Sequence, residues 1–543
     1  MARKIILLSG HVSSGKTTLS DQLVGEFGFQ VLKTRDLLSR IAPTVQMERG
    51  AMQGLGDRLD RQTKGTWVRD GLANRLTHDE PETIIIDAVR RKEQIVAIRQ
   101  SYGRRVVHIH LTAKRDELAR RYAKRLTKDF VELPSFAEVT KNPTEAQIES
   151  LSQIADIVIH TDRCLVQDVV VRASSHLGLF GRGYERLVDV LVGGQYGSEG
   201  KGNIASYLAR EYDILVRVGG PNAGHKVFQE PAPYTFHQLP SGTRTSDARL
   251  VIAPGSVIDV KTLRQEIADC GVEAERLSID PHAIVVERSD IRNERRLVKG
   301  IASTGRGVGW ATIRRIRDRH PKHKVRFAAD IVELRPFIRG TYKQLEKAFA
   351  KGERILLEGT QGTGLSLYHG TYPYVTSRDT TVAGCLAEAG ISPSMVRRVI
   401  MVCRTYPIRV GNPDGKTFQS GPMSQEISLK EIAARSGLAL KELQSTEITS
   451  TTHRPRRVAE FDWTLLRKGA SLNGPTDIAL TFVDYLDKEN RKARRFEQLT
   501  PKSIQFIEEI ERVAGASVSL ISTRFEFRNI IDRRAWSVRS DAF

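Results

Sequence analysis

Apolar positions in residues 4–170 form short continuous runs, which alternate with segments where apolar residues recur every three or four positions. The runs predict buried β-strands, and the longer period predicts helices between them. The predicted strands are 4–8, 29–32, 83–86, 105–111 and 155–160, and the predicted helices are 35–41, 67–76, 92–100 and 114–126. Strand and helix in regular alternation are typical of βαβ units, so we expect a parallel sheet with helices on both faces.

A second apolar run, at 187–192, begins another α/β region that continues to the end of the sequence. The segment before it, 173–184, contains serine and glycine without a clear period, which is typical of a linker. We therefore predict an N-terminal α/β domain over 1–172, a linker over 173–186 and a large α/β domain over 187–543.

Hydrophobic residues make up 40% of the 543 positions and charged residues 27%, as in globular proteins. No apolar run is long enough to span a bilayer, and the first strand leaves no room for a signal peptide, so we expect a cytoplasmic location. Cys164, Cys270, Cys385 and Cys403 are far apart, which indicates neither a zinc site nor a disulfide framework.

The net charge of +20 suits an anionic partner, either nucleic acid or nucleotides. The basic segments 314–320 and 454–457 are not interleaved with aromatic residues, so nucleic-acid binding is not expected. Anionic nucleotides are the partner class that the rest of the sequence favours.

Two glycine-rich loops each follow a predicted strand and begin a predicted helix. The first reads G-H-V-S-S-G-K-T over 10–17 and satisfies the Walker pattern G-x-x-x-x-G-K-[ST]. Its glycines turn backbone N–H groups toward a phosphate, and its lysine adds a positive charge. We predict that Gly10, Gly15, Lys16 and Thr17 bind a nucleotide, with Thr17 also a Mg²⁺ ligand. The second loop, G-G-Q-Y-G-S-E-G-K-G over 193–202, predicts a second nucleotide site.

Further features near the first loop resemble the P-loop nucleoside monophosphate kinases, over about residues 3–165. Asp87 ends a predicted strand, where a Walker-B-type carboxylate would meet Mg²⁺. Arginines assigned by position to the phosphates of donor and acceptor are Arg35, Arg90, Arg120 and Arg121. The sequence does not indicate which acceptor such a kinase would use.

Five motifs within 187–543, taken in order, closely resemble adenylosuccinate synthetase. The family's G-D-E-G-K-G loop is G-S-E-G-K-G here, at 197–202. Its N-A-G-H, T-T-G-R-G and E-G-x-Q-G motifs correspond to 222–225, 303–307 and 358–362. The motif H-G-T-Y-P-Y-V-T-S matches 369–377 residue for residue.

The resemblance implies a ligase that joins L-aspartate to C6 of a purine nucleotide carrying a 6-oxo group. The γ-phosphoryl group of ATP or GTP first moves to the purine O6, and aspartate then displaces phosphate from C6. Such chemistry needs charge neutralisation, an acid for the leaving oxygen and a base for the purine N1. The resemblance also implies Mg²⁺ as cofactor and a homodimer formed through the ligase domain.

The family's site residues carry over by motif. The catalytic positions are His225 as general acid, Gln361, which orients the purine, and Ser198. Substrate binding falls to Asn222, Thr304, Thr376, Arg454 and Arg456, the two arginines gripping the aspartate carboxylates. Nucleotide binding falls to Gly197, Glu199, Gly200, Lys201, Gly202 and Asp484, and Mg²⁺ coordination to the Gly224 carbonyl.

Two motifs depart from the family's pattern near the C-terminus. In the aspartate loop the family's T-T-G-R-R-R-R is T-T-H-R-P-R-R, with His453 for glycine and Pro455 for arginine. In the segment that reads guanine, T-K-L-D is T-F-V-D, so Phe482 stands where a lysine would stack. Both ATP and GTP therefore stay open as donors.

Ser198 replaces the aspartate that serves the family as N1 base and Mg²⁺ ligand. Serine cannot act as an anion there, but it leaves room for a purine 2-amino group. The same replacement is found in phage-type relatives that convert dGMP to 2-amino-N6-succinyladenylate. We expect a bifunctional enzyme, a ligase favouring GMP or dGMP fused to a nucleotide kinase. The alternatives are an ordinary synthetase acting on IMP, or a nucleotide-sensing protein with one inactive domain.

Overall fold

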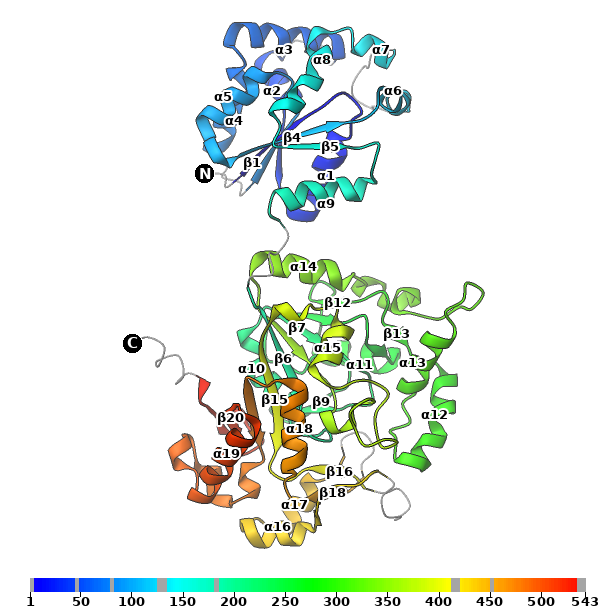
Figure 1. The fold of residues 1–543 in the computed structure, drawn as a ribbon, viewed down its shortest axis with the longest axis vertical. Coiled ribbons are helices and arrows are strands. Elements are labelled where there is room, and N and C mark those ends of the chain that lie inside the picture. Colours follow the sequence, from blue (N-terminus) through cyan, green and yellow to red (C-terminus); the bar gives the residue numbers. More distant parts are fainter. Residues whose placement is uncertain are drawn as a thin grey trace. The chain divides into compact units, whose positions relative to one another are not determined.

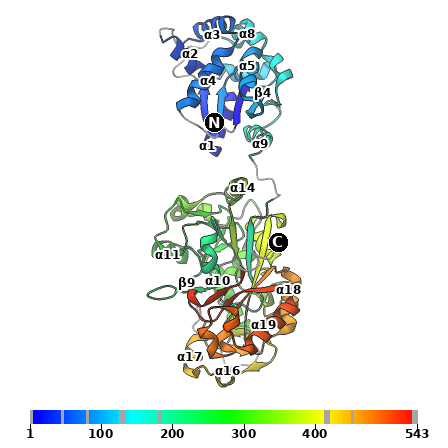
Figure 2. The ribbon, with the colours of Figure 1, turned by 90° about the vertical axis from the view of Figure 1, so that its left-hand side faces the viewer.

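The computed structural model describes residues 4–43, 48–78, 83–124, 134–179, 185–411, 420–449 and 454–534. The chain forms two compact units, unit 1 (Met1–Phe180) and unit 2 (Gly181–Phe543) (Figure 1, Figure 2). Each unit has its own sheet and its own hydrophobic cores. No helix in the described part of the chain is long and apolar enough to cross a membrane.

Unit 1 contains a five-stranded sheet in the order β2-β3-β1-β4-β5, with every pairing parallel. Its strands are β1 (Lys4–Ser9), β2 (Gln30–Lys33), β3 (Thr83–Asp87), β4 (Val106–Thr112) and β5 (Ile157–His160). The predicted parallel sheet is confirmed, because each strand lies within two residues of its predicted bounds.

Helices cover both faces of this sheet, as predicted. They are α1 (Lys16–Phe27), α2 (Thr34–Ile41), α3 (Arg49–Thr63), α4 (Thr66–His78), α5 (Lys92–Tyr102), α6 (Arg115–Ala123), α7 (Phe136–Val139), α8 (Pro143–Ala146) and α9 (Val166–His176). Ile5 and Leu7 of β1 pack against α2 to α5, whereas Ile6 and Leu8 pack against α1 and α9. This alternation follows from the two-residue period of a strand.

Helix α3 was not predicted, because Arg49–Thr63 holds three glycines and few apolar residues. The predicted helix at 114–126 is α6, which ends at Ala123, and residues 125 and 126 lie outside the described residues. Helix α9 runs into the predicted linker, with Ala173 and Leu177 buried in the core of unit 1. Unit 1 therefore extends past the predicted boundary at residue 172, because the apolar spacing 169, 170, 173 and 177 continues a helix.

Unit 2 is a large α/β unit built on a nine-stranded sheet in the order β12-β10-β7-β14-β6-β15-β19-β20-β21. Its strands are β6 (Val188–Gly193), β7 (Ile214–Arg217), β10 (Arg249–Ile252), β12 (Leu277–Ile279), β14 (Ile355–Glu358), β15 (Val396–Arg404), β19 (Asp477–Thr481), β20 (Ser517–Ser522) and β21 (Ile530–Asp532). Every pairing is parallel except that of β20 with β21.

Smaller sheets pair β8 (His225–Val227) with β9 (Tyr234–Phe236), β11 (Val257–Ile258) with β13 (Ile284–Val285), and β18 (Arg456–Ala459) with β16 (Ile408–Val410) and β17 (Glu426–Ile427). The helices of unit 2 are α10 (Lys201–Leu208), α11 (Val260–Cys270), α12 (Arg288–Ile301), α13 (Val308–Arg317), α14 (Thr341–Lys351), α15 (Val382–Ala389), α16 (Leu429–Ser436), α17 (Leu440–Thr446), α18 (Trp463–Asn473) and α19 (Pro501–Ala514).

Strand β6 lies in the interior of this sheet and is buried along its whole length. Val190 and Val192 belong to the core with α14, α15, α18 and α19, whereas Leu191 belongs to the core with α10 and α11. The loops after β6, β7, β14, β15 and β19 leave the same edge of the sheet, because these strands are parallel. In open α/β sheets that edge is where ligands bind.

Candidate functional site

Both glycine-rich loops present the same backbone to the helix that follows. Gly15 in the first loop has a φ of 99° and Gly200 in the second has a φ of 92°, both in the left-handed region that favours glycine. Each is followed at once by the lysine that begins the helix, Lys16 in α1 and Lys201 in α10. The first N–H groups of a helix have no partner within it, so both positions suit an anion.

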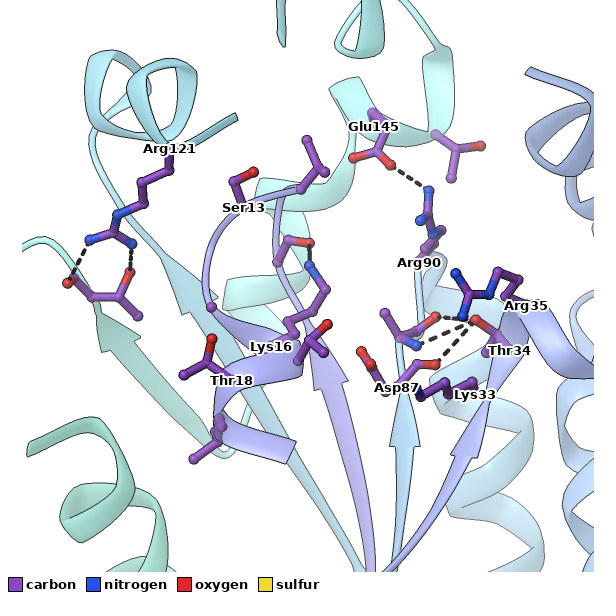
Figure 3. Close-up of a pocket in the computed structure, with 18 of the residues that line it drawn as sticks. Ser13, Lys16, Thr18, Lys33, Thr34, Arg35, Asp87, Arg90, Arg121 and Glu145 are labelled. Carbon is purple, nitrogen blue, oxygen red and sulfur yellow. Dashed lines mark hydrogen bonds and ion pairs between the residues drawn. The ribbon is translucent and has the colours of Figure 1, made fainter. Parts of the chain in front are cut away.

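In unit 1 a cavity of about 880 Å³ lies at the carboxyl ends of β1 and β3 (Figure 3). The predicted residues Gly10, Gly15, Lys16, Thr17 and Asp87 all line it. The volume is at the upper end of the range for small-molecule sites, so the cavity has room for more than one small ligand.

Lys16, at the beginning of α1, and Asp87, at the end of β3, face this cavity (Figure 3). The Lys16 Nζ donates to the Gly10 carbonyl at 2.8 Å and to the His11 carbonyl at 2.7 Å. Burial raises the pKa of the Asp87 carboxyl, and the charges of Lys16 and Lys33 oppose that shift. The Thr17 hydroxyl and the Asp87 carboxylate, which line the same cavity, are oxygen ligands of the kind that Mg²⁺ takes together with several waters.

The four arginines assigned by position, Arg35, Arg90, Arg120 and Arg121, also line the cavity. Arg90 bonds to Glu145 of α8, and Arg121 donates to the Thr161 hydroxyl at 2.9 Å (Figure 3). Arg120 pairs with Glu117 at 2.7 Å. The cavity thus holds several cations besides Lys16.

The other end of the cavity was not predicted. It is lined by Met52, Asp57, Asp60 and Trp67 of α3 and α4, together with Glu145. The Glu145 side chain is 1% exposed, and its Oε2 has no hydrogen-bond partner among the described residues. Because α3 and α8 were not predicted, nothing in the sequence indicated that these residues lie in the same cavity as the glycine loop.

In unit 2 the buried Glu199 folds the second loop around its own carboxylate. Its Oε1 accepts from the Gly197 N–H at 2.8 Å and the Gln195 N–H at 3.2 Å, and its Oε2 accepts from the Lys201 Nζ at 2.5 Å. The Thr481 hydroxyl donates to the Glu199 carbonyl at 2.6 Å, which ties the loop to the end of β19. The predicted residues of this loop therefore form one compact turn.

His225 lies against the beginning of α10. A Cβ at Gly202 would stand 2.7 Å from the Cβ of His225, so this close approach requires glycine. The His225 Nδ1 bonds to a carboxylate oxygen of Glu358, which also accepts from Arg217 at 3.2 Å. Burial, aided by the charge of Arg217, lowers the pKa of His225 to about 4. Burial alone would raise the pKa of Glu358, but Arg217 and His225 outweigh it and lower that pKa to about 2.

Gln361 and Thr376 come together at the same edge of the sheet. The Gln361 Nε2 donates to the Thr376 hydroxyl at 2.8 Å, and the Gln361 Oε1 has no partner among the described residues. Ser198 has a left-handed φ of 54° and its Oγ lies 3.5 Å from the Arg456 Nη2. The structure therefore brings a predicted aspartate-binding arginine to the serine that replaces the family's base.

The other predicted residues occupy separate positions. Asn222 and Gly224 are half-buried in the loop after β7, and Thr304 is half-buried in the loop after α12. Arg454 is half-buried, its backbone N–H bonds to the Thr449 hydroxyl at 2.9 Å, and residues 451–453 of its loop lie outside the described residues. Asp484 is buried and accepts from the Arg491 Nε at 3.0 Å.

Arg217 and Glu358 are the contacts that the sequence analysis missed around His225, and Arg404 and Glu447 are those it missed around Arg456. Arg217, Glu358 and Arg404 are each the last residue of a buried strand. A charged residue that ends an apolar run was a signal that could have found all three. Within the described residues, no group of three or more His, Cys, Asp or Glu could hold a metal ion.

Comparisons with known proteins divide the chain into the same two regions. The family model for adenylosuccinate synthetase matches residues 190–329 and 322–491, and a model described as an AAA domain matches residues 5–153. The adenylosuccinate synthetase of Methanocaldococcus jannaschii is 40% identical over 354 residues, 64% of this chain and 96% of that protein.

Two solved structures share the fold of unit 2. One is the succinoaminodeoxyadenylate synthetase of cyanophage S-2L bound to dGMP and dATP as an energy donor. It has 28% identity, a TM-score of 0.54, and coverage of 64% of this chain and 96% of that one. The other, adenylosuccinate synthetase from Plasmodium falciparum, has 23% identity, a TM-score of 0.54, and coverage of 64% and 100%. The chain therefore belongs to the adenylosuccinate synthetase family and carries a P-loop kinase-like domain before its synthetase domain.

Proposed function

We propose that unit 2 joins L-aspartate to C6 of GMP or dGMP, forming 2-amino-N6-succinyladenylate or its deoxy form with consumption of a nucleoside triphosphate. The observation that carries the proposal is Ser198 beside Arg456 in a site whose other motif residues are present. An aspartate side chain at residue 198 would crowd the 2-amino edge of guanine. Serine removes both the bulk and the charge.

The chain's own residues assist two proton steps. The Nδ1 of His225 is held by Glu358, which leaves Nε2 to give a proton toward the purine O6 and the γ-phosphate. His225 is neutral in the free protein at pH 7, and the negative charge of a bound triphosphate favours its protonated form. The positive charge of Arg456 beside Ser198 stabilises the anion that forms when the purine N1 proton passes to solvent water, so no anionic side-chain base is needed.

Mg²⁺ would neutralise charge on the transferring phosphoryl group when bound. In unit 2 the Gly224 carbonyl would hold it together with the phosphates of the nucleotide, because Ser198 offers no carboxylate. In unit 1 the Thr17 hydroxyl and the Asp87 carboxylate would hold it.

The preferred substrate is tested with the purified protein, aspartate, ATP and each of IMP, GMP and dGMP, with products identified by mass spectrometry. We expect GMP or dGMP to be consumed at least about 10-fold faster than IMP, because a site that bonds an amino group rejects the analogue lacking it. Ser198→Asp is expected to lose this activity and to favour IMP, and Ser198→Ala, which adds no charge, is the matched control. If the unmodified protein converts IMP faster than GMP and dGMP, the result would contradict this proposal and support the alternative, an ordinary synthetase acting on IMP.

For the donor, we propose an adenine nucleotide rather than GTP. Asp484, the residue assigned to guanine, is buried and bonded to Arg491, and burial raises its pKa to about 6. The phage relative named above was solved with dATP as donor. We expect kcat/KM for ATP to exceed that for GTP by at least about 10-fold, measured as phosphate release under identical conditions. Arg491→Gln, which frees Asp484, should narrow the difference, and a preference for GTP in the unmodified protein would contradict the assignment.

For unit 1 we propose a nucleotide kinase whose acceptor is a nucleoside monophosphate. The size of its cavity and the arginines that line it support two anionic ligands, a triphosphate donor and a phosphate-bearing acceptor. The competing class, a nucleotide sensor with one inactive unit, predicts binding without turnover. A homodimer through unit 2 and a cytoplasmic location stay predictions.

A further inference from the structure

Glu447 is a carboxylate with no exposed side-chain surface, directly after α17. It accepts from three side chains: the Arg404 Nη2 at 2.6 Å, the Arg456 Nη1 at 3.2 Å and the Tyr485 hydroxyl at 2.9 Å. The Glu447 carbonyl also accepts from the Arg456 N–H at 2.9 Å. Glu447 therefore fixes both the backbone and the guanidinium of Arg456.

This cluster holds two guanidinium groups and one carboxylate, so it has one excess positive charge. Arg404 has no exposed side-chain surface and the Arg456 side chain is 12% exposed, so the charge is largely removed from water. The Nε of Arg456 and the Nη1 of Arg454 are buried and have no hydrogen-bond partner within the described residues. A buried charge requires a counter-ion, and a ligand carboxylate would supply it.

Arg404 connects the same cluster to residues 481–484, the segment that the family resemblance assigns to the base of the donor nucleotide. Its guanidinium lies 4.0 Å over the ring of Phe482, and the Phe482 and Tyr485 rings are 5.2 Å apart. Two backbone bonds of 3.0 Å join Arg404 to the Gln195 side chain in the second glycine loop. Phe482 and the second glycine loop both contact Arg404, and Arg404 shares the Glu447 carboxylate with Arg456. A ligand that moves Phe482 or this loop can therefore affect the position of Arg456.

We infer that Glu447 is a positioning residue that holds Arg456 for the aspartate carboxylate and couples it, through Arg404 and Phe482, to the bound donor nucleotide. The inference rests on the proposed ligase function. By linkage, donor binding then strengthens aspartate binding, and aspartate strengthens donor binding by the same factor. Arg456 faces Ser198 on its other side, so the coupling ends at the purine edge where aspartate must attack.

Glu447→Gln keeps the shape and removes the charge. We expect the aspartate KM to rise at least about 10-fold while kcat falls less than about 3-fold, because the change loosens a binding group without touching the transferring phosphoryl group. Calorimetric titration of aspartate, with dGMP present and with or without a non-hydrolysable ATP analogue, measures the coupling. The gain in aspartate affinity on adding the analogue should be present in the unmodified protein and absent in the variant.

Asp189→Asn is the matched control. Asp189 is also buried and accepts from an arginine and a tyrosine, Arg397 at 2.6 Å and Tyr212 at 2.6 Å, at the far end of β6 from the glycine loop. It should lower thermal stability and leave the aspartate KM unchanged. If Glu447→Gln does not fold, Phe482→Leu, which leaves all three bonds of Glu447, should still abolish the coupling.

An unchanged aspartate KM in Glu447→Gln, or an equal rise in Asp189→Asn, would overturn the inference. Unmodified protein that shows no gain in aspartate affinity with the analogue would do the same. Failure of the proposed substrate can be distinguished from failure of this inference. If the protein uses IMP instead of GMP or dGMP, each of these measurements can still be made with IMP.

Discussion

Replacement of His225 by asparagine is expected to lower ligase turnover by at least about 10², the usual contribution of a positioned acid. Asparagine keeps a polar side chain near Glu358 but has no proton to give at pH 7. The measurement is the rate of succinyl-nucleotide formation at saturating aspartate, nucleotide and ATP. Because the acid acts in the transition state, we expect kcat to fall and the substrate KM values to change little.

The same preparation supplies the control for this variant, since phosphoryl transfer by unit 1 should be unchanged. Glu358→Gln tests the role of the residue that orients His225. It should reduce turnover less than His225→Asn, because it weakens the orientation of the imidazole without removing it. Turnover of His225→Asn within about 3-fold of the unmodified protein would remove His225 from the chemistry.

Lys16→Ala is expected to abolish phosphoryl transfer in unit 1, by about 10³ or more, because the lysine neutralises charge on the transferring phosphoryl group. The assay follows conversion of ATP to ADP with each nucleoside monophosphate as acceptor. Lys16 lines the cavity of unit 1, and the synthetase motifs all lie in unit 2. Ligase activity should therefore be retained in full.

Two results would contradict this assignment. Loss of both activities in a folded Lys16→Ala protein would show that the ligase activity of unit 2 depends on the phosphate site of unit 1. Absence of turnover in the unmodified protein with every monophosphate, together with tight ATP binding, would favour the sensing class. Lys33→Ala is the matched control, because Lys33 lines the same cavity outside the glycine loop and should cost less.

The sequence predicted the sheet of unit 1 and both glycine loops, because these depend on local patterns of a few residues. Continuous apolar runs define the strands, and a glycine before a lysine defines the start of each phosphate-binding helix. Motif order within 187–543 likewise predicted that Ser198, His225, Gln361 and Arg456 belong to one site.

What the sequence could not predict were contacts between distant positions. Glu447 meets Arg404 across 43 residues and His225 meets Glu358 across 133 residues, with no local pattern to join them. Asp57, Asp60 and Glu145 reach the cavity of unit 1 from α3 and α8, whose sequences lack a clear apolar period. Burial of a charged residue is decided by the tertiary fold, which pairs it with a partner that the linear order does not reveal.

The glycine at position 202 limits what evolution or engineering can do with this enzyme. Because Gly202 has no side chain, His225 can lie directly against it. A Cβ at residue 202 would lie only 2.7 Å from the Cβ of His225. An alanine would displace the His225 side chain from the direction of the proton transfer that we propose, while leaving every other motif residue unaltered. Variant libraries directed at new purines can therefore explore Ser198 and its neighbours, but Gly202, the first glycine after Gly200, is a position that they should leave fixed.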